Sequence, residues 1–210
     1  MNTTRSFNID TGNDGGWLGA FHRESLEEGL PVIPPETAAL LRVLTETKKP
    51  SRILEIGCAV GFSACLMAMH GAENCRVTTI DRYDYMIGRA RENFRKYGLE
   101  DRITLIEGDA AGILPMLAGP FGLIFVDAAK AQYLSFLPEC LRLLELGGLL
   151  VCDDVLTDVD KDRYAIPRRK RTAHSRMRAF LAAVTEMDGL VTTVLNIGGG
   201  VSVTVKTKAK

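Results

Sequence analysis

The fold of this chain is decided by residues 51–63, which read Ser-Arg-Ile-Leu-Glu-Ile-Gly-Cys-Ala-Val-Gly-Phe-Ser. Residues 52–56 are short and apolar with an acid near the end, which predicts a buried central strand. Gly57 and Gly61 then form a loop where the backbone can approach a ligand closely, and an apolar helical pattern starts at Phe62. A strand, a glycine loop and a helix in this order predict a nucleotide-binding unit.

The spacing of the glycines favours one kind of nucleotide over another. A dinucleotide site uses three glycines, as Gly-x-Gly-x-x-Gly, with the pyrophosphate at the helix N-terminus. This chain has Glu-x-Gly-x-x-x-Gly, and Phe62 and Ser63 do not provide a third glycine. The pattern favours S-adenosylmethionine, with space for its methionine part beside the glycines and acceptor oxygens on Glu55. An ordinary glycine turn in another α/β protein stays open at this point.

Composition limits the class of protein. The chain has 210 residues, is 46% hydrophobic and carries 26 basic and 26 acidic residues, which suits one globular domain with a sizeable core. No apolar run approaches the roughly 20 residues of a membrane span, and residues 1–15 are polar, so we expect a cytoplasmic protein without a signal peptide or membrane anchor. The five cysteines form no Cys-x-x-Cys pair, which predicts reduced, buried thiols.

Strand and helix patterns alternate along the chain, which predicts an α/β fold. Residues 1–20 are polar and without a period, so we expect a flexible arm before a single domain over residues 21–210. Strand patterns follow the first strand at 76–81, 102–107, 122–127 and 148–153, and helical patterns lie at 21–29, from Pro35 onward, and at 83–97, 110–117, 132–144 and 172–187. This alternation predicts a mostly parallel sheet with helices on both faces. Residues 190–196 and 201–206 are joined too tightly for a crossover and predict a C-terminal antiparallel hairpin.

Acids stand at the ends of the predicted strands, where open α/β sheets bind their ligands. Asp81 ends the second strand about 20 residues after Gly61, where a carboxylate can accept both ribose hydroxyls of a nucleoside. Asp109 follows the third strand and can hold an adenine edge, cap the helix that starts at Ala110, or do both.

Three further acids, Asp127, Asp153 and Asp154, follow the fourth and fifth strands. Carboxylates that meet at adjacent strand ends repel one another unless a cation joins them. Oxygen ligands favour a hard ion, Mg²⁺ first, with Mn²⁺ or Ca²⁺ also suitable, and they disfavour zinc. The alternative is that these acids only cap the loops and helix that follow them.

Several separated motifs resemble those of the metal-dependent O-methyltransferases of the catechol and caffeoyl-CoA type. They occur in the same order and cover about residues 30–205. They are Leu-Glu-Ile-Gly at 54–57, Phe-Ser at 62–63, Gly-Asp-Ala at 108–110, Val-Asp-Ala-Ala-Lys at 126–130 with Tyr133, and Cys-Asp-Asp-Val-Leu at 152–156. The family usually carries Asn where this chain has Asp154, which turns a neutral ligand into a third acid.

This resemblance implies a seven-stranded Rossmann-like S-adenosylmethionine methyltransferase fold and a homodimer. It implies that Asp127, Asp153 and Asp154 hold the metal. The cofactor site that we expect, including the loop glycine Gly61 and the shared acid Asp127, consists of Ile33, Glu55, Gly57, Gly61, Ser63, Asp81, Asp109, Ala110 and Asp127.

Methyl transfer needs an acceptor oxyanion held in line with the sulfonium methyl group. A divalent ion that binds the acceptor hydroxyl provides acidity and orientation together, so Asp127 is predicted to be catalytic as well. Lys130 is the second predicted catalytic residue, as the proton acceptor or as a cation that stabilises the oxyanion. The alternative for Lys130 is a solvated lysine at the start of a helix.

The segment 157–178 is expected to choose the substrate, because it carries eight Lys or Arg residues against three Asp. It suits a solvated face, a clamp for an anionic substrate such as a CoA thioester, or a contact for RNA phosphates through Arg168, Arg169, Lys170 and Arg171. It also resembles bacterial relatives that methylate 5-hydroxyuridine at the tRNA wobble position. We expect a small catechol-like or phenolic hydroxyl acceptor, with tRNA as the alternative. A third possible function is that of a non-catalytic S-adenosylmethionine-binding module.

Overall fold

The computed structural model of the protein describes residues 16–157, 159 and 165–208. Seven strands form one sheet in the order β3-β2-β1-β4-β5-β7-β6. The parallel strands are β1 (Arg52–Ile56), β2 (Arg76–Asp81), β3 (Ile103–Glu107), β4 (Phe121–Val126) and β5 (Leu144–Cys152). The antiparallel hairpin of β6 (Leu190–Leu195) and β7 (Val201–Lys206) completes one edge, so the predicted mostly parallel sheet with a C-terminal hairpin is confirmed.

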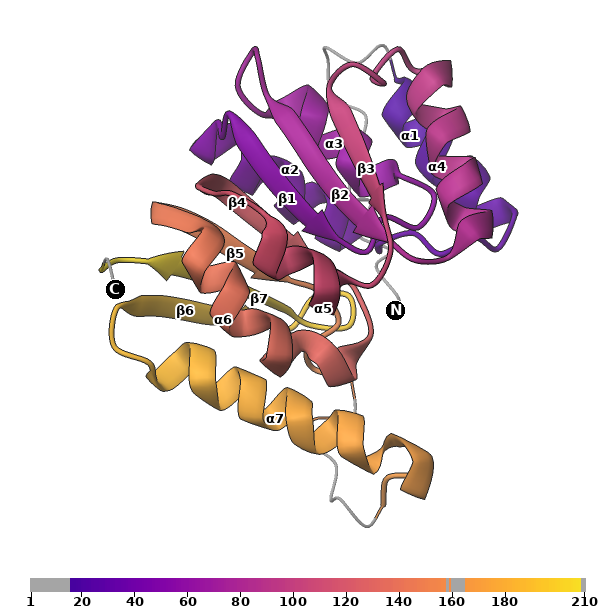
Figure 1. Ribbon diagram of the computed structural model, residues 1–210. Coiled ribbons are helices and arrows are strands. Elements are labelled where there is room, and N and C mark those ends of the chain that lie inside the picture. Colours follow the sequence, from indigo (N-terminus) through magenta and orange to yellow (C-terminus); the bar gives the residue numbers. More distant parts are fainter. Residues whose placement is uncertain (1–15, 158, 160–164, 209–210) are drawn as a thin grey trace, which may run out of the picture.

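Helices cover both faces of this sheet (Figure 1). One face carries α1 (Trp17–Glu27), α2 (Pro35–Lys48), α3 (Phe62–His70) and α4 (Asp84–Lys96). The other carries α5 (Ala110–Ile113), α6 (Tyr133–Leu143) and α7 (Arg171–Glu186). Short 3₁₀ turns, η1 (Leu114–Met116), η2 (Lys130–Gln132) and η3 (Arg168–Lys170), precede or follow these helices.

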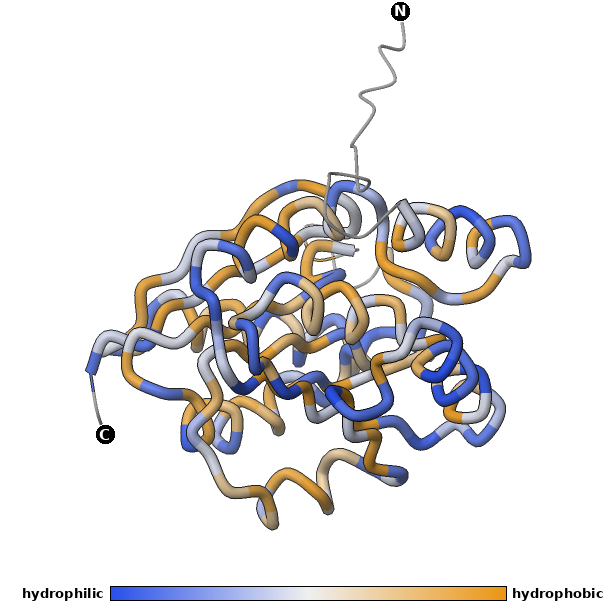
Figure 2. The backbone as a smooth tube through the Cα atoms, turned by 90° about the horizontal axis from the view of Figure 1, so that it is seen from above, coloured by the Kyte–Doolittle hydropathy of each residue, from blue (hydrophilic) through white to orange (hydrophobic). Residues whose placement is uncertain are grey.

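The central strand β1 shows how the sequence builds two cores. Side chains alternate between the faces of a strand, so Ile53 packs with α1–α4 whereas Leu54 and Ile56 pack with α5–α7. All three side chains are buried. Strand β1 lies between β2 and β4 inside the sheet, and Figure 2 shows hydrophobic stretches crossing the middle of the molecule.

Two boundaries differ from the sequence prediction by more than two residues. Helix α1 begins at Trp17 instead of residue 21, because the Trp17 ring stacks on Tyr97 with centroids 4.1 Å apart and Leu18 is fully buried. Residues 17–20 therefore belong to the folded domain, while the predicted arm at 1–15 lies outside the described residues. Strand β5 begins at Leu144, which pairs with Phe121 before a register shift.

All five cysteines are free and buried, as the sequence predicted. In the part of the chain that the structure describes, we find no helix that is both long and apolar enough to cross a membrane.

Candidate active site

The glycine loop after β1 brings two strand ends into contact. Gly57 has a φ of +98°, and a Cβ atom there would lie 1.9 Å from the backbone oxygen of Asp127. Gly61, with a φ of +87°, precedes α3, and a Cβ atom there would lie 2.5 Å from the ring of Phe94. Only glycine fits either position, so the loop is shaped by its neighbours as well as by any ligand.

Asp81 holds this loop in place. Its Oδ2 atom accepts hydrogen bonds from the backbone N–H groups of Cys58 at 2.9 Å and Ala59 at 2.8 Å. Its Oδ1 atom accepts from the N–H groups of Arg82 at 2.7 Å and Tyr83 at 3.0 Å. A carboxylate offers about four acceptor positions, so the acid predicted to bind ribose also organises the loop on which the site is built, and a ribose hydroxyl would share or replace one of these four hydrogen bonds.

A cavity of about 550 Å³ opens at the carboxyl ends of the parallel strands. A smaller one of about 30 Å³ adjoins it, since both are lined by Gly57 and Asp127. The structure therefore brings seven of the nine predicted cofactor residues to two adjoining cavities. The larger is lined by Gly57, Asp81, Asp109, Ala110 and Asp127, and the smaller by Ile33, Gly57, Ser63 and Asp127.

Glu55 lies outside the lining of both cavities, as Gly61 does. The strand alternation turns Glu55 under α3, where it is fully buried and faces Thr79 in the β1–β2 register. Thr79 Oγ1 donates a hydrogen bond to Glu55 Oε2 at 2.5 Å. Burial raises the pKa of Glu55 to about 8.

Asp109 performs the capping role that the sequence left as an alternative. Its side chain accepts a hydrogen bond from Ala111 N at 2.9 Å at the start of α5. Arg82 Nη1 also contacts Asp109 Oδ2, at 3.1 Å. Because Asp109 lines the larger cavity as well, capping and ligand contact are compatible.

The carboxylates of Asp127 and Asp153 repel each other at the ends of β4 and β5. Burial, and next the charge of Asp153, raise the pKa of Asp127 to about 7. Burial chiefly raises the pKa of Asp153 to about 6. Thr37 Oγ1 donates a hydrogen bond to Asp153 Oδ1 at 3.3 Å.

Asp154 has a different set of partners. Its Oδ2 atom lies 2.6 Å from Lys130 Nζ, and Thr157 donates its hydroxyl to Oδ1. The backbone of Asp154 is left-handed, with a φ of +55°. Asp154 therefore forms an ion pair with Lys130, the predicted catalytic lysine.

Asp127 and Asp153 offer a hard cation two carboxylates. Among the described residues, no three Asp, Glu, His or Cys side chains converge as a metal-binding group. A divalent ion would relieve the repulsion between these two acids, of which Asp153 is buried and Asp127 half-buried. Asp154, the third predicted ligand, lies next to them and contacts Lys130.

Tyr133 links the ends of β4 and β5. Its hydroxyl lies within donating distance of Asp153 O (3.0 Å) and Val126 O (3.2 Å), and it accepts from Ala128 N at 3.3 Å. The ring is buried and does not line the larger cavity. Its role is packing and backbone support.

Several lining residues were not anticipated from the sequence. Arg82 and Tyr83 follow Asp81 directly, so the strand end was the available signal for both. The others come from helices and loops whose facing depends on packing. They are Pro31, Tyr85, Met86, Gln132 and Phe136.

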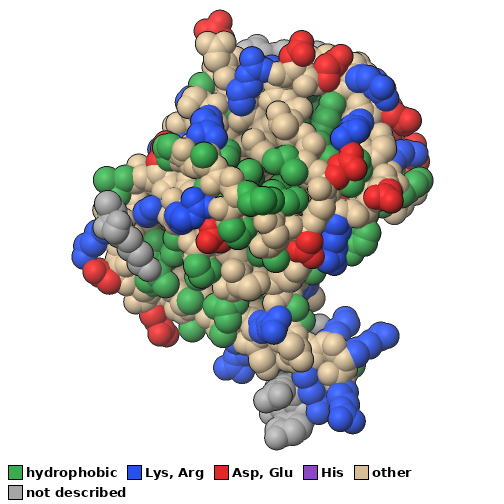
Figure 3. Space-filling view, in the orientation of Figure 1, with side chains coloured by type: hydrophobic (Ala, Val, Ile, Leu, Met, Phe, Trp, Pro, Cys, Tyr) green, Lys and Arg blue, Asp and Glu red, His purple; other side chains and the backbone are tan. Residues whose placement is uncertain are grey.

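The basic segment lies beside the loop that carries Lys130. Arg168, Arg169 and Lys170 are exposed, and Arg176 Nη1 donates to Ala131 O at 3.1 Å. Lys161, Arg163 and the three acids of the segment lie outside the described residues. Figure 3 shows Lys and Arg side chains gathered over the projecting end of the molecule formed by η3 and the start of α7.

Comparisons with known proteins agree with this geometry. A family model described as O-methyltransferase matches residues 23–207. A catechol O-methyltransferase from Niastella koreensis is 34% identical over 138 residues, which are 63% of this chain and 62% of that protein, so the match covers less than two thirds of that relative.

Two solved structures share the fold. The SAH-bound methyltransferase PaMTH1 from Podospora anserina is 28% identical, with a TM-score of 0.78 over 91% of this chain and 88% of that one. An O-methyltransferase from Bacillus cereus in complex with SAH has a TM-score of 0.80 over 95% and 93% of the two chains. At 23% identity, the second likeness concerns the fold alone.

Proposed function

Because this chain belongs to the O-methyltransferase family, we propose that it transfers the methyl group of S-adenosylmethionine to a hydroxyl oxygen of a small catechol-like or phenolic acceptor. One observation carries the proposal. The cavity of about 550 Å³ lies where the glycine loop, Asp81 and Asp109 meet Asp127, whose charge interacts with those of Asp153 and Lys130.

The larger cavity has room for the cofactor, and the small one extends it beside Gly57. Asp81 and Asp109 line the larger cavity and offer acceptors for the nucleoside, and the methionine part would lie near Gly57, toward Ile33 and Ser63. Pockets for ligands of this size commonly enclose about 300–1,000 Å³. The likeness to a SAH-bound methyltransferase supports this assignment.

Asp127 and Asp153 would hold a divalent cation, Mg²⁺ first. When bound, the ion would supply acidity and orientation to the acceptor hydroxyl. Lys130 Nζ lies 2.6 Å from Asp154 Oδ2, as an ion pair does. This arrangement favours Lys130 as the cation that stabilises the acceptor oxyanion over Lys130 as a neutral base.

The acceptor class is supported by the relatives, since the Niastella koreensis protein is named for catechol. The aromatic and apolar side chains of Tyr83, Tyr85, Met86 and Phe136 line the larger cavity together with Asp81, where they can pack against a planar ring such as the adenine of the cofactor.

The test is transfer of label from methyl-labelled S-adenosylmethionine to a panel of catechols and phenols. We expect methyl ethers in the presence of Mg²⁺, loss of transfer in EDTA, and recovery on adding Mg²⁺ or Mn²⁺. Full activity in EDTA would remove the cation from the mechanism. Absence of label in every phenol, with cofactor bound, would refute the acceptor class.

A second acceptor, tRNA with a wobble 5-hydroxyuridine, is favoured by the exposed run of Arg168, Arg169 and Lys170 next to the Lys130 loop. Each phosphate contact releases condensed counterions. Neutralising these three residues and Arg171 should therefore weaken tRNA binding and its salt dependence, while methylation of a free catechol stays unchanged. Label in hypomodified tRNA that this variant loses would favour tRNA, and label only in phenols would eliminate it.

The family likeness is also the basis for proposing a homodimer. Light scattering of the purified protein at several concentrations measures this directly. A mass of one chain, close to 23.0 kDa, at all concentrations would refute it.

A further inference from the structure

We infer that the hydroxyl group of Tyr133 is a spacer in the hydrogen-bond ladder between β4 and β5, and that it sets the gap between the carboxylates of Asp127 and Asp153. Tyr133 is then a positioning residue for the cation that these two acids would hold. The inference rests on the proposed function, because it concerns that cation.

The ladder between β4 and β5 is regular up to the last pair of strand residues. Val126 pairs with Cys152, and Asp153 N donates the next hydrogen bond to Val126 O at 3.0 Å. If the parallel ladder continued, Asp127 would pair with Asp153. The hydrogen bond after that would run from Ala128 N to Asp153 O.

The Tyr133 hydroxyl stands in the place of that next hydrogen bond. It accepts from Ala128 N at 3.3 Å and donates to Asp153 O at 3.0 Å. It also lies 3.2 Å from Val126 O, so its single hydrogen is shared between two carbonyl oxygens. A direct bond between backbone groups is about 2.9–3.0 Å long. Two hydrogen bonds through an inserted oxygen therefore hold the two strand ends further apart than one direct bond would.

The gap matters because paired residues on neighbouring parallel strands point to the same face of a sheet. Such strands lie about 4.7–4.9 Å apart, so carboxylates at the paired positions of Asp127 and Asp153 repel each other. A divalent ion needs both carboxylates within reach at once, at about 2.0–2.1 Å for Mg²⁺. A hydroxyl inserted between the two chains at this level fixes the separation at which the ion is met.

Helix α7 holds the spacer in place. The ring of Tyr133 is fully buried and packs edge-on against Phe180, with centroids 5.6 Å apart. Arg176, one turn earlier in α7, donates from Nη1 to Ala131 O at 3.1 Å. The helix therefore supports both Tyr133 and the loop before it, which carries Lys130.

The test is Tyr133→Phe, which removes the hydroxyl and keeps the ring. The Mn²⁺ affinity of the cofactor-free protein is measured by electron paramagnetic resonance, together with thermal unfolding. Loss of a group that orients metal ligands commonly costs about 10–100-fold in metal affinity, so we expect the Kd for Mn²⁺ to rise about tenfold or more. The melting temperature should also fall, because Ala128 N loses its acceptor.

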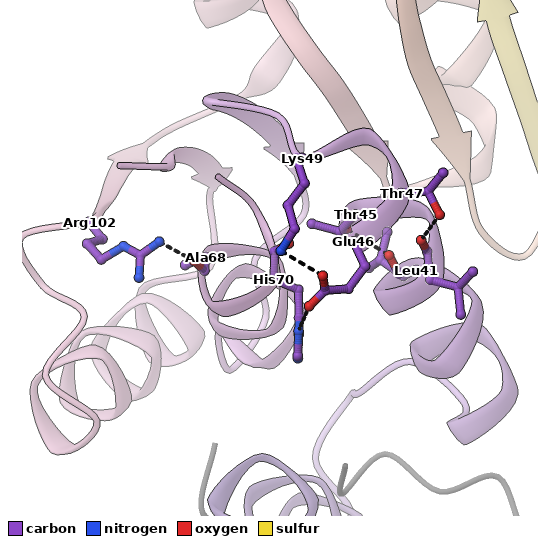
Figure 4. Close-up of polar contacts among 9 residues, drawn as sticks. Leu41, Thr45, Glu46, Thr47, Lys49, Ala68, His70 and Arg102 are labelled. Carbon is purple, nitrogen blue, oxygen red and sulfur yellow. Dashed lines mark hydrogen bonds and ion pairs between the residues drawn. The ribbon is translucent and has the colours of Figure 1, made fainter. Parts of the chain in front are cut away.

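The matched control is Thr45→Val, which also removes one buried hydroxyl and keeps the shape of the side chain. Thr45 is fully buried, and its hydroxyl donates to Leu41 O at 2.7 Å within α2. Figure 4 shows Thr45 with Leu41, close to the contacts of Glu46 with His70 and Lys49. This variant should keep the wild-type Kd for Mn²⁺ even though its melting temperature falls.

A measurement on the wild-type protein tests the inserted hydroxyl if Tyr133→Phe does not fold. Amide hydrogen exchange is followed by nuclear magnetic resonance at Ala128, whose N–H group donates to the buried hydroxyl. We expect this amide to exchange much more slowly than an unprotected one. Exchange at the unprotected rate would overturn the inference.

The outcomes separate this inference from the proposed function. If wild-type protein binds no Mn²⁺, the cation assignment is overturned and the role of Tyr133 with it. If wild-type protein binds Mn²⁺ and Tyr133→Phe binds it equally well, only the role of Tyr133 is overturned. An equal loss of Mn²⁺ affinity in Thr45→Val would also overturn that role, because the effect would then follow from lower stability alone.

Discussion

Replacing Asp81 by Ala tests whether this acid builds the cofactor site. The change removes the acceptor of four backbone N–H groups, and the hydrogen bond from Cys58 N is buried whereas the other three are partly buried. Leaving one buried donor unsatisfied costs about 1–3 kcal/mol, and the partly buried donors can turn to water at a smaller cost. We therefore expect the free energy of unfolding to fall by about 1–3 kcal/mol.

The same substitution should weaken cofactor binding more than it weakens the fold. The glycine loop loses its anchor, and the cofactor loses charge-assisted hydrogen bonds of about 1.5–3 kcal/mol. At 1.4 kcal/mol per factor of ten, the Kd for S-adenosylmethionine should rise by roughly 10–150-fold.

Isothermal titration calorimetry and denaturant unfolding measure both effects. Asp101→Ala, at an exposed turn before β3, is the matched loss of one acid and should behave as wild type. Unchanged cofactor affinity in Asp81→Ala would refute the reasoning, and so would an affinity loss that Asp101→Ala reproduces.

Three further substitutions follow from the geometry. Gly57→Ala should lower the free energy of unfolding by about 4 kcal/mol or more, because the methyl group meets Asp127 O at 1.9 Å, whereas Gly88→Ala should not; equal melting temperatures would refute this. The pKa of Glu55 in the folded protein, about 8, lies above its ordinary value of 4.5 because the side chain is buried. Its stabilising contribution is therefore complete below about pH 4.5 and is lost as the pH rises through about 8. Glu55→Gln should therefore gain stability over wild type by several kcal/mol between pH 5 and 9 in urea unfolding, and a pH-independent difference would contradict the buried-acid account. The free energy of unfolding of Asp154→Asn should lie within about 1 kcal/mol of the wild-type value, because the ion pair with Lys130 is partly exposed. Its kcat should fall while the Mg²⁺ concentration that it requires stays unchanged. A higher Mg²⁺ requirement would show that Asp154 is a metal ligand.

The sheet and its ligand end could be read from the sequence because local patterns carry that information. The apolar run of β1 and the spacing of Asp81 from Gly61 are consequences of strand length and crossover length, which repeat in such folds. The start of α1 was missed because Trp17 is held by Tyr97, 80 positions along the chain, and no local pattern encodes that stacking.

The detailed directions of the site residues depend on tertiary contacts. Glu55 stands at the strand end in the sequence, but strand alternation places it under α3 against Thr79. Asp154 follows Asp153 directly, yet a left-handed backbone and the hairpin turn direct it to Lys130. Residue type identified the acids, and only the packing of α2 and the hairpin distinguishes their tasks.

The most direct test of the account is one turnover with S-adenosylmethionine that carries a deuterated methyl group, using Mg²⁺, a catechol, and wild-type or Asp127→Ala protein. Mass spectrometry of the product, with calorimetry to confirm that both proteins bind the cofactor, locates the label. The account predicts a deuterated methyl ether on oxygen from wild-type protein and none from Asp127→Ala. Equal transfer by the two proteins, or label on carbon instead of oxygen, would contradict it.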